Sequence, residues 1–430
     1  MAIPHAGFAI RSFHLHQSLI DHSTPQAGPP AAAPAAKTRI HALDLIRGVS
    51  ILGILAVNAD GFAAPMAAAL NHLTWPFPNE GWTALSFWLM DTLFREKFVT
   101  LFSMLFGISV FLVGGELGDK ARGRILWRRL GLLFLFGMLH GFGIWWGDIL
   151  SLYAVTGVLM FFCRSWRPRT LAIAGLVLFV ALPLSRFPVA ALPGATPQEY
   201  AAASARLVPS AAVLERRKAA IAATMAEAKD SWRGAYRLNT EQYLRLLSGY
   251  GWQILPTLGL MMIGLALFKS GFLAGACATR RYAATIAAGA AAALLIGWLC
   301  LRRDIVDAPV LGGGSAEILL APFVSLAYAA ALILLLRAGA RRVLAPFAAA
   351  GRMAFTNYLT QSLAMTSIFY GGRGALMGEV DRPGLWAIVI GVWVLQLAWS
   401  TLWFTRFETG PFEWVWRSLT LGRRVALLKR

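Results

Sequence analysis

An aspartate, an arginine and an asparagine share one face of the first long apolar segment. Asp44, Arg47 and Asn58 are three and eleven residues apart, and at about 100° per residue they fall within about 60° of one helical stripe. Ionisable groups at membrane depth are costly, so this stripe is expected to face the protein interior or an aqueous cavity. A functional site explains the stripe as well as a structural set does, in which the charged pair is neutralised and the asparagine bonds a neighbouring helix.

A histidine and an aspartate flank a stretch rich in glycine and tryptophan. His140 and Asp148 are separated by Gly-Phe-Gly-Ile-Trp-Trp-Gly, whose glycines permit a tight turn that folds the carboxylate back toward the imidazole. An imidazole titrates near neutral pH and suits proton transfer, and a carboxylate that holds it sets its tautomer and basicity. The pair is the candidate catalytic centre, and the alternative is a buried histidine that only packs.

A third polar group lies in a late apolar segment that is too polar for contact with lipid. Asn357 and Gln361 are one helical turn apart, Tyr358 neighbours Gln361, and Arg352 precedes them. Hydrogen bonding between helices and contact with a substrate or cofactor explain this group equally well. Arg352 is the residue best suited to an anionic phosphate. Lys97, at the start of another apolar segment, is a further binding candidate for which a structural role is the alternative.

The composition is that of a polytopic membrane protein. Hydrophobic residues make up 57% of the 430 residues, charged residues 14%, and the mean hydropathy is +0.60. The net charge of +19 does not indicate nucleic-acid binding, because the basic residues lie mostly between the apolar segments, as topology signals do. The three cysteines are far apart and have no metal or redox spacing, so neither a metal site nor a disulfide is expected.

Ten apolar segments are long enough to be transmembrane helices, so we expect an all-α membrane protein. They cover residues 43–64, 97–115, 125–146, 148–163, 170–188, 250–269, 282–301, 316–337, 343–370 and 384–405. The segment 82–94 is too short once its flanking charges are counted, and we expect it to be an interfacial or re-entrant helix that leads into the second span.

The basic residues predict the topology. With ten spans, nearly all clusters of lysine and arginine fall on one side, so both termini are expected in the cytoplasm. Arg302 and Arg303 are the exception, and the acidic Asp304 and Asp307 follow them. The expected parts are a disordered tail (1–36), an N-terminal membrane half (37–188), an external loop with one or two amphipathic helices (189–249), a C-terminal membrane half (250–420) and a basic tail (421–430).

At these same residues the chain resembles the YeiB family of membrane proteins. The resemblance runs from about residue 39 to 420 and covers a C-terminal part known as a domain of unknown function. The motifs that carry it are Leu43-Asp44-x-x-Arg47-Gly48 leading to Asn58, Lys97-Phe98, His140-Gly141 with Gly147-Asp148-Ile149-Leu150, Gly351-Arg352-Met353-Ala354 with Thr356-Asn357-Tyr358-Leu359-x-Gln361, and Gly410-Pro411-x-Glu413-Trp414-x-Trp416-Arg417.

A more distant similarity concerns the chemistry. The opening Asp-x-x-Arg-Gly with its apolar run is similar to the first span of heparan-α-glucosaminide N-acetyltransferase and of acyltransferase-3 proteins. In acyltransferase-3 proteins the arginine is followed after ten residues by a histidine, whereas the same spacing from Arg47 ends on Asn58. In the heparan enzyme the catalytic histidine follows the first span, where this chain has His72. Because His72 falls outside the YeiB pattern, His140 is favoured as the base.

The resemblance implies a transmembrane acyltransferase of the bacterial inner membrane. An acyl-thioester such as acyl-CoA would bind near Arg47 and Arg352 on the cytoplasmic side, and its acyl group would reach an acceptor near His140 and Asp148 on the external side. His140 would be the base or a transient acyl carrier. The residues that would hold the acyl oxygen are Asn58, Asn357, Tyr358 or Gln361.

Two other classes remain open. Charged and amide residues on broken helices also mark the substrate path of a transporter or flippase, and a structural membrane component would need no chemistry. No tightly bound cofactor is expected, and acyl-CoA enters only as a co-substrate. The expected partners are the lipid bilayer and a small-molecule or glycan acceptor. Nucleic acid is not an expected partner, and an oligomer is compatible with the sequence.

Overall fold

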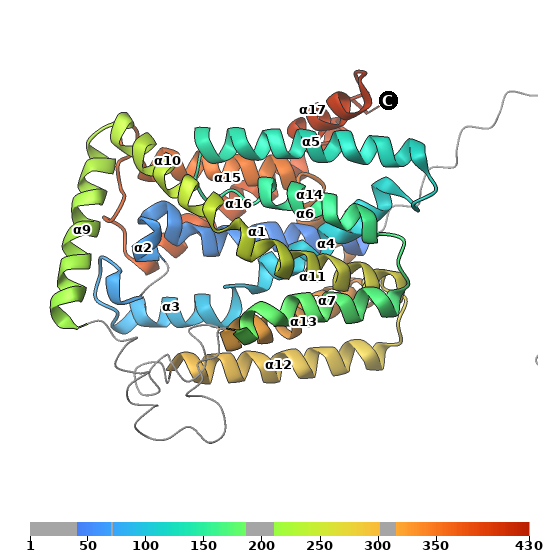
Figure 1. The fold of residues 1–430 in the computed structure, drawn as a ribbon, viewed down its shortest axis with the longest axis horizontal. Helices are drawn as coiled ribbons and strands as arrows, with labels where there is room; N and C mark the ends of the chain where they lie inside the picture. Colours follow the sequence, from blue (N-terminus) through green and yellow to red (C-terminus); the bar gives the residue numbers. More distant parts are fainter. Residues whose placement is uncertain (1–40, 70–71, 186–209, 302–314, 430) are drawn as a thin grey trace, which may run out of the picture. The chain divides into compact units, whose positions relative to one another are not determined.

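The computed structural model describes residues 41–69, 72–185, 210–301 and 315–429, and their regular secondary structure is helical (Figure 1). The predicted disordered tail (1–36) and the arginine pair at 302–303 lie outside these residues. The helices are α1 (His41–Ala63), α2 (Met66–Ala69), η1 (His72–Thr74), α3 (Gly81–Leu93), α4 (Lys97–Gly114), α5 (Lys120–Gly143), α6 (Leu150–Cys163), α7 (Pro168–Ser185), α9 (Ala211–Asp230), α10 (Trp232–Ser248), α11 (Tyr250–Lys269), α12 (Thr279–Leu301), α13 (Ser315–Arg337), α14 (Arg341–Arg352), α15 (Ala354–Phe369), α16 (Arg382–Arg406) and α17 (Pro411–Leu421).

The predicted all-α membrane class is confirmed. Within the described residues, seven helical stretches are long and apolar enough to cross a membrane. They are α1, the joined stretch Gly81–Gly114, α5, α11, α12, α13 and α16, and two shorter apolar helices lie at Leu150–Cys163 and Pro168–Ala181. The protein is therefore a multi-pass membrane protein. The expected number of ten spans and the expected cytoplasmic termini stay predictions.

Two of the apolar segments read from the sequence contain a break in the helix. The helix expected at 82–94 is α3, and it leads through Phe94–Glu96 into α4, so that the two count as one 34-residue stretch. Glu96 makes the break with a left-handed φ of 66°. The segment expected as a span at 343–370 is divided into two helices, because Met353 separates α14 from α15. Apolar composition could not reveal either break, since hydropathy reports how apolar a segment is and not whether its backbone is continuous.

Glu413 explains why α15 can begin inside a continuous apolar segment. The first N–H groups of a helix have no partner within the helix and need a partner from outside it. Glu413, in α17, accepts hydrogen bonds from the N–H groups of Phe355 and Thr356 at 2.7 and 3.1 Å and from the Thr356 hydroxyl at 2.6 Å. A residue far along the chain therefore supplies the helix cap.

Glycines allow α1 and α14 to approach one another closely. A Cβ atom on Gly351 of α14 would lie 1.9 Å from the carbonyl oxygen of Asp44, and one on Gly48 of α1 would lie 1.8 Å from that of Phe347. Only glycine permits two backbones to come this near. The glycines of the motifs around residues 48 and 351 are thus explained by packing between helices.

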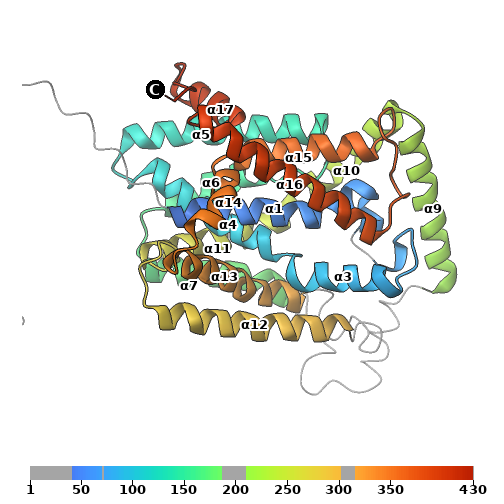
Figure 2. The ribbon, with the colours of Figure 1, turned by 180° about the vertical axis from the view of Figure 1, so that it is seen from behind.

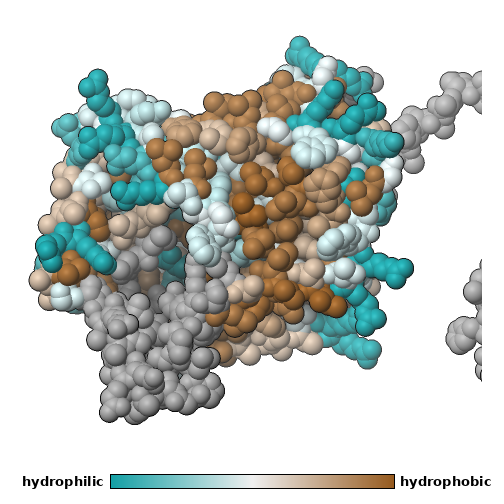
Figure 3. All heavy atoms as spheres, in the orientation of Figure 1, coloured by the Kyte–Doolittle hydropathy of each residue, from teal (hydrophilic) through white to brown (hydrophobic). Residues whose placement is uncertain are grey.

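The amphipathic helices expected within 189–249 are α9 and α10. Figures 1 and 2 show most of the long helices running side by side, with α9 lying across them at one end. Hydrophobic side chains cover the middle of the visible face, and hydrophilic ones gather near its two ends (Figure 3). Such a distribution is typical of a protein surrounded by a bilayer. The predicted division into two membrane halves and an external loop stays a prediction.

Candidate catalytic centre

The turn between α5 and α6 brings the predicted histidine and aspartate together. His140 lies in the last turn of α5, and Asp148 lies just before the first residue of α6. The backbone N–H groups of Ile144 and Trp145 both bond to the carbonyl of His140, at 2.8 and 2.9 Å, and so end the helix. His140 Nδ1 lies 3.1 Å from Asp148 Oδ1. This contact confirms the predicted folding back of the carboxylate, and its role in a reaction stays a prediction.

The imidazole is bonded through both of its nitrogens. Its Nε2 lies 2.9 Å from the hydroxyl oxygen of Ser362 in α15. Because a carboxylate only accepts hydrogen bonds, Nδ1 carries the proton and donates it to Asp148, and Nε2 accepts from the serine hydroxyl. His140 and Ser362 are each 1% exposed and Asp148 is 3% exposed. Ser362, His140 and Asp148 thus form a buried chain of hydrogen bonds with the order hydroxyl, imidazole and carboxylate.

Asp148 is held in place by further donors. Its Oδ2 accepts the N–H of Ser151 at 2.9 Å and the Ser151 hydroxyl at 2.5 Å, and its Oδ1 accepts the N–H of Leu150 at 3.2 Å. The Tyr250 hydroxyl donates to the Asp148 carbonyl at 3.0 Å and lies 2.8 Å from the Ser151 hydroxyl. These donors fix the position of the carboxylate beside the imidazole.

Aromatic side chains surround the imidazole. The Tyr358 ring lies 4.9 Å from the His140 ring, and the Tyr358 hydroxyl donates to the Gly147 carbonyl at 3.2 Å. The Trp145 ring lies 6.5 Å away and stacks on Phe62 with a centroid distance of 4.0 Å. These rings exclude water from the hydrogen-bonded chain and strengthen the interactions within it.

Helix α10 covers the turn that carries the catalytic pair. Asn239 donates to the Gly141 carbonyl at 2.9 Å, and a Cβ atom on Gly141 would lie 2.1 Å from the Tyr243 ring. Burial raises the pKa of the Tyr243 hydroxyl to about 12. The segment predicted as an external loop therefore contributes side chains to the surroundings of His140.

Sequence reasoning missed Ser362. The residue closes the polar motif of α15, but it is separated from His140 by 222 positions, and no spacing along the chain links the two. The available signal was the helical periodicity: Tyr358 and Ser362 are four residues apart and therefore lie on one face. That face turns toward the imidazole.

The other polar residues of α15 point elsewhere. Asn357 donates to the carbonyl of Ala350 at 3.0 Å and to the Ser400 hydroxyl at 3.1 Å. Gln361 donates to the Ile51 carbonyl at 3.3 Å and to Gln396 at 2.8 Å. These bonds join α15 to α14, α16 and α1, and a role of the two amides in binding stays a prediction.

The first polar stripe is found as an ion pair and a separate asparagine. Arg47 Nη1 lies 3.2 Å from Asp44 Oδ1, which is the predicted contact one turn apart, and Arg47 Nη2 lies 3.5 Å from the Ser109 hydroxyl. Asn58 is half-buried, and within the described residues its side chain meets no partner that would tie it to His140. The side chain of His72 lies outside the described residues.

Arg129 of α5 interacts electrostatically with charged residues of α1 and α17. The charges of Arg47 (α1) and Arg417 (α17) act on Arg129 of α5, whose guanidinium lies 3.7 Å from the centroid of the Trp416 ring. The charge of Glu413 of α17 also acts on Arg129. Burial raises the pKa of the Glu413 carboxyl, and the bonds from Thr356 oppose that rise. Arg352 points away and donates to the Glu408 carbonyl at 3.0 Å over the Phe404 ring.

A second buried group of charges surrounds the break between α3 and α4. Asp60 Oδ2 lies 3.9 Å from Arg95 and 3.7 Å from Arg382, and Arg95 also bonds Asp91. Lys97 is fully buried and donates to the carbonyl of Asp91 at 2.5 Å. The binding candidate Lys97 therefore lies in this charged region and bonds the backbone of Asp91, and its role in binding stays a prediction.

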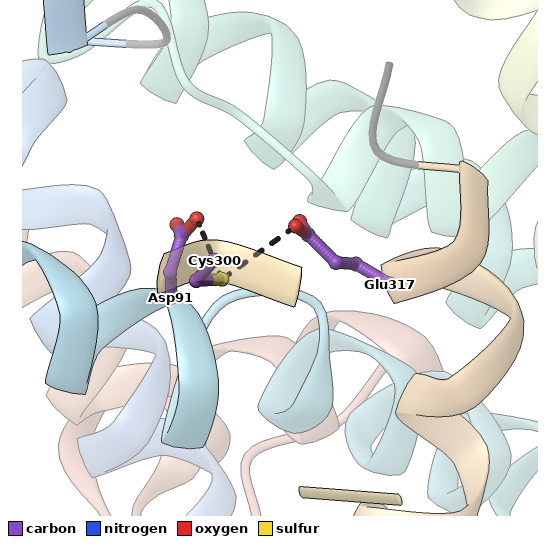
Figure 4. A group of neighbouring side chains, drawn as sticks. All are labelled: Asp91, Cys300 and Glu317. Atoms are coloured by element: carbon purple, nitrogen blue, oxygen red, sulfur yellow. Dashed lines mark hydrogen bonds between the residues drawn. The ribbon is translucent and has the colours of Figure 1, made fainter. Parts of the chain in front are cut away.

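Three side chains of this charged region belong to residue types that can bind a metal ion. Asp91 of α3, Cys300 of α12 and Glu317 of α13 converge (Figure 4), and their ligand atoms lie within 4.8 Å of one another. The spacing of the cysteines along the chain gave no metal prediction, and the grouping arises only from the packing of three helices. The positive charge of Lys97 acts on all three side chains, so the group already faces a cation of the protein.

Comparison with known proteins gives the family. Residues 267–423 match the family described as "Protein of unknown function (DUF418)". The chain is 32% identical to the uncharacterised protein YeiB of Escherichia coli (strain K12) over 88% of this chain and 95% of the relative. It is 30% identical to the uncharacterised protein YxaH of Bacillus subtilis (strain 168) over 89% of this chain and 94% of the relative. No solved structure matches it. The chain, with its paired His140 and Asp148, therefore belongs to the YeiB family of membrane proteins, which carry a DUF418 domain at the C-terminus.

Proposed function

We propose that this protein is an acyltransferase of the bacterial inner membrane. The observation that carries the proposal is the buried imidazole of His140, which is held by Asp148 on one nitrogen and accepts a hydroxyl on the other. This is the arrangement in which a histidine removes a proton from a hydroxyl and returns it to a leaving group. Acyl transfer needs both of these proton movements.

The donor in this proposal is a cytoplasmic acyl-thioester such as acyl-CoA. The charges of Arg47 and Arg417 both act on Arg129, and guanidinium groups suit the phosphates of such a donor. Glu413 links these arginines to the start of α15, because it caps that helix and its charge acts on Arg129. At 1.5 Å per residue, Ser362 lies about 12 Å further along α15, so a flexible thioester arm along this helix would bring its carbonyl to His140.

The acceptor would be a hydroxyl or amine of a glycan, a glycolipid or a small metabolite on the external side. Tyr358 is the best donor for the acyl oxygen, since its ring lies 4.9 Å from the imidazole and its hydroxyl has only to leave the Gly147 carbonyl. Asn357 and Gln361 already bond neighbouring helices, which makes them less suited to this part.

The test is transfer of label in membranes supplied with radiolabelled acyl-CoA. His140→Ala removes the base, and we expect incorporation into lipid or soluble acceptors to fall by about 10³-fold or more. His41→Ala is the matched control, because His41 is an exposed histidine at the first residue of α1. Transfer by His140→Ala at the wild-type rate would show that the proposed role is wrong.

The charged break between α3 and α4 supports a second candidate, a transporter or flippase. Buried charges at the ends of interrupted helices also mark the path of a polar solute through a membrane protein, and Asp60, Arg95 and Arg382 form such a group. Uptake of a solute into vesicles without any covalent change, together with no turnover of thioester, would favour this candidate over the acyltransferase.

A further inference from the structure

Ser362 is the only described residue that offers a hydroxyl to the free nitrogen of His140. Its oxygen lies 2.9 Å from Nε2, whereas its other acceptor, the Tyr358 carbonyl, is 3.3 Å away. Ser151, the other serine of the site, bonds the carboxylate of Asp148 instead. The position of Ser362 relative to the imidazole is therefore that of an activated nucleophile.

We propose that Ser362 is a covalent nucleophile, which carries the acyl group between donor and acceptor. The inference rests on the proposed acyl transfer and adds to it a two-step course through an acyl-serine. His140 is then the base and acid of both steps, and it is not itself acylated. Asp148 is a positioning residue that keeps the proton on Nδ1.

The atoms and protons balance in each step. In the first, the Ser362 oxygen attacks the thioester carbonyl, its proton passes to His140 Nε2, the C–S bond breaks, and the thiol leaves with that proton. In the second, the acceptor hydroxyl or amine attacks the ester of Ser362 and gives its proton to Nε2. The C–O bond to Ser362 then breaks, and the serine oxygen takes the proton back. No oxidant, metal or other co-reactant is needed.

The place of the serine in the fold supports this course. Ser362 lies in the middle of α15, whose start is capped by Glu413 and whose end leads to Tyr370, where the Tyr370 hydroxyl bonds Asn239 of α10. A covalent intermediate allows the two substrates to be bound one after the other.

The first experiment uses a fluorophosphonate ester, a reagent that phosphonylates activated serines with loss of fluoride. Purified full-length protein in lipid nanodiscs is treated, digested and mapped by mass spectrometry. We expect label on Ser362 in the wild type, and we expect labelling to fall to background in Ser362→Ala and His140→Ala. Ser367→Ala is the matched control, because Ser367 lies on the same helix, is exposed and has a hydroxyl that bonds the Leu363 carbonyl. It should be labelled like the wild type.

The second experiment traps the acyl-enzyme itself. Protein mixed with radiolabelled acyl-CoA is denatured, and a hydroxylamine-sensitive ester is sought on Ser362. Elution volume and melting temperature show whether each variant is folded. Equal labelling of Ser362→Ala and wild type, adducts only on other residues, or no adduct with either reagent would overturn the inference.

The two proposals can fail separately. If Ser362→Ala still transfers label at the wild-type rate while His140→Ala does not, the acceptor attacks the thioester directly, and only the covalent step is wrong. If the fluorophosphonate labels Ser362 but no thioester is consumed in membranes, the serine is a nucleophile for another donor. If both hold, transfer by the double variant Ser362→Ala/His140→Ala should be no lower than that by either single variant, because the residues act as a unit.

Discussion

At the scale of single residues, the important contact is the one between Asp148 and His140. The carboxylate is bonded by two backbone N–H groups and the Ser151 hydroxyl, so it is fixed before it meets the imidazole. It thereby selects the tautomer in which Nε2 is free to accept a proton. The other conspicuous polar residues, Asn357 and Gln361, join helices.

We therefore expect Asp148→Asn to fold like the wild type and to lose most of its acyl-transfer activity. The amide would offer an N–H group where Nδ1–H needs an acceptor, which favours the wrong tautomer, and label transfer should fall by about 10²- to 10⁴-fold. Transfer in membranes with radiolabelled acyl-CoA measures this. Asp119→Asn is the control, since Asp119 caps α5 and asparagine caps equally well. Full transfer by Asp148→Asn would contradict the role given to the carboxylate.

At the scale of elements, the broken segments matter most. An apolar segment continues through residues 343–370, but Met353 divides it, and Glu413 compensates by capping α15 from another helix. The sequence predicted each apolar segment because hydropathy is local. It could not predict the division, because the cap that makes the division tolerable is about 60 residues away.

Glu413→Ala should lower the melting temperature of the purified protein. It leaves two buried N–H groups at the start of α15 without their acceptor, at a cost of about 1–3 kcal/mol each, whereas Glu413→Gln keeps an acceptor oxygen and should lose less stability.

Burial raises the folded-state pKa of Glu413 above its ordinary 4.5, so the folded state binds more protons than the unfolded state. Wild-type stability should therefore fall as the pH rises from 4.5 through the raised pKa. Glu413→Gln should lack this part of the pH dependence. The same pH dependence of stability in the wild type and in Glu413→Gln would contradict the raised pKa of Glu413.

Gly351→Ala should also destabilise the protein, by preventing the close approach of α1 and α14. Its Cβ would lie 1.9 Å from the Asp44 carbonyl, and overpacking of this kind costs about 1–3 kcal/mol or more. Gly391→Ala is the matched control, because nothing lies within 4 Å of its Cβ. Thermal unfolding of both variants in detergent gives the comparison, and equal melting temperatures would refute the packing argument.

At the scale of the whole described unit, distant parts of the chain are interlocked by buried charges. Asp60 of α1 faces Arg95, which precedes α4, and Arg382, which begins α16. Arg382 is 2% exposed and lies 4.2 Å from the centroid of the Trp75 ring. The two predicted membrane halves are thus joined by ion pairs as well as by the packing of α1 on α14.

Removal of one charged side chain from this group of ion pairs should destabilise the protein. Arg382→Met leaves Asp60 with one cation fewer in a buried setting, and we expect a loss of about 3–5 kcal/mol, seen as a lower melting temperature and a poorer yield of folded protein. The double variant Arg382→Met/Asp60→Leu removes the uncompensated charge and should recover much of that loss. A double variant that is worse than the single one would mean that the two side chains do not compensate one another.

The sequence by itself determined the membrane class, the positions of nearly all apolar helices and the pairing of His140 with Asp148. These depend on local properties: hydropathy over about twenty residues, helical periodicity and a turn of seven residues between the pair. Only the tertiary structure decided that Ser362 meets the imidazole, that Glu413 caps a broken helix and that Asp91, Cys300 and Glu317 converge. Each of these contacts joins segments far apart in the chain, and the packing of helices, which no local pattern records, brings them together.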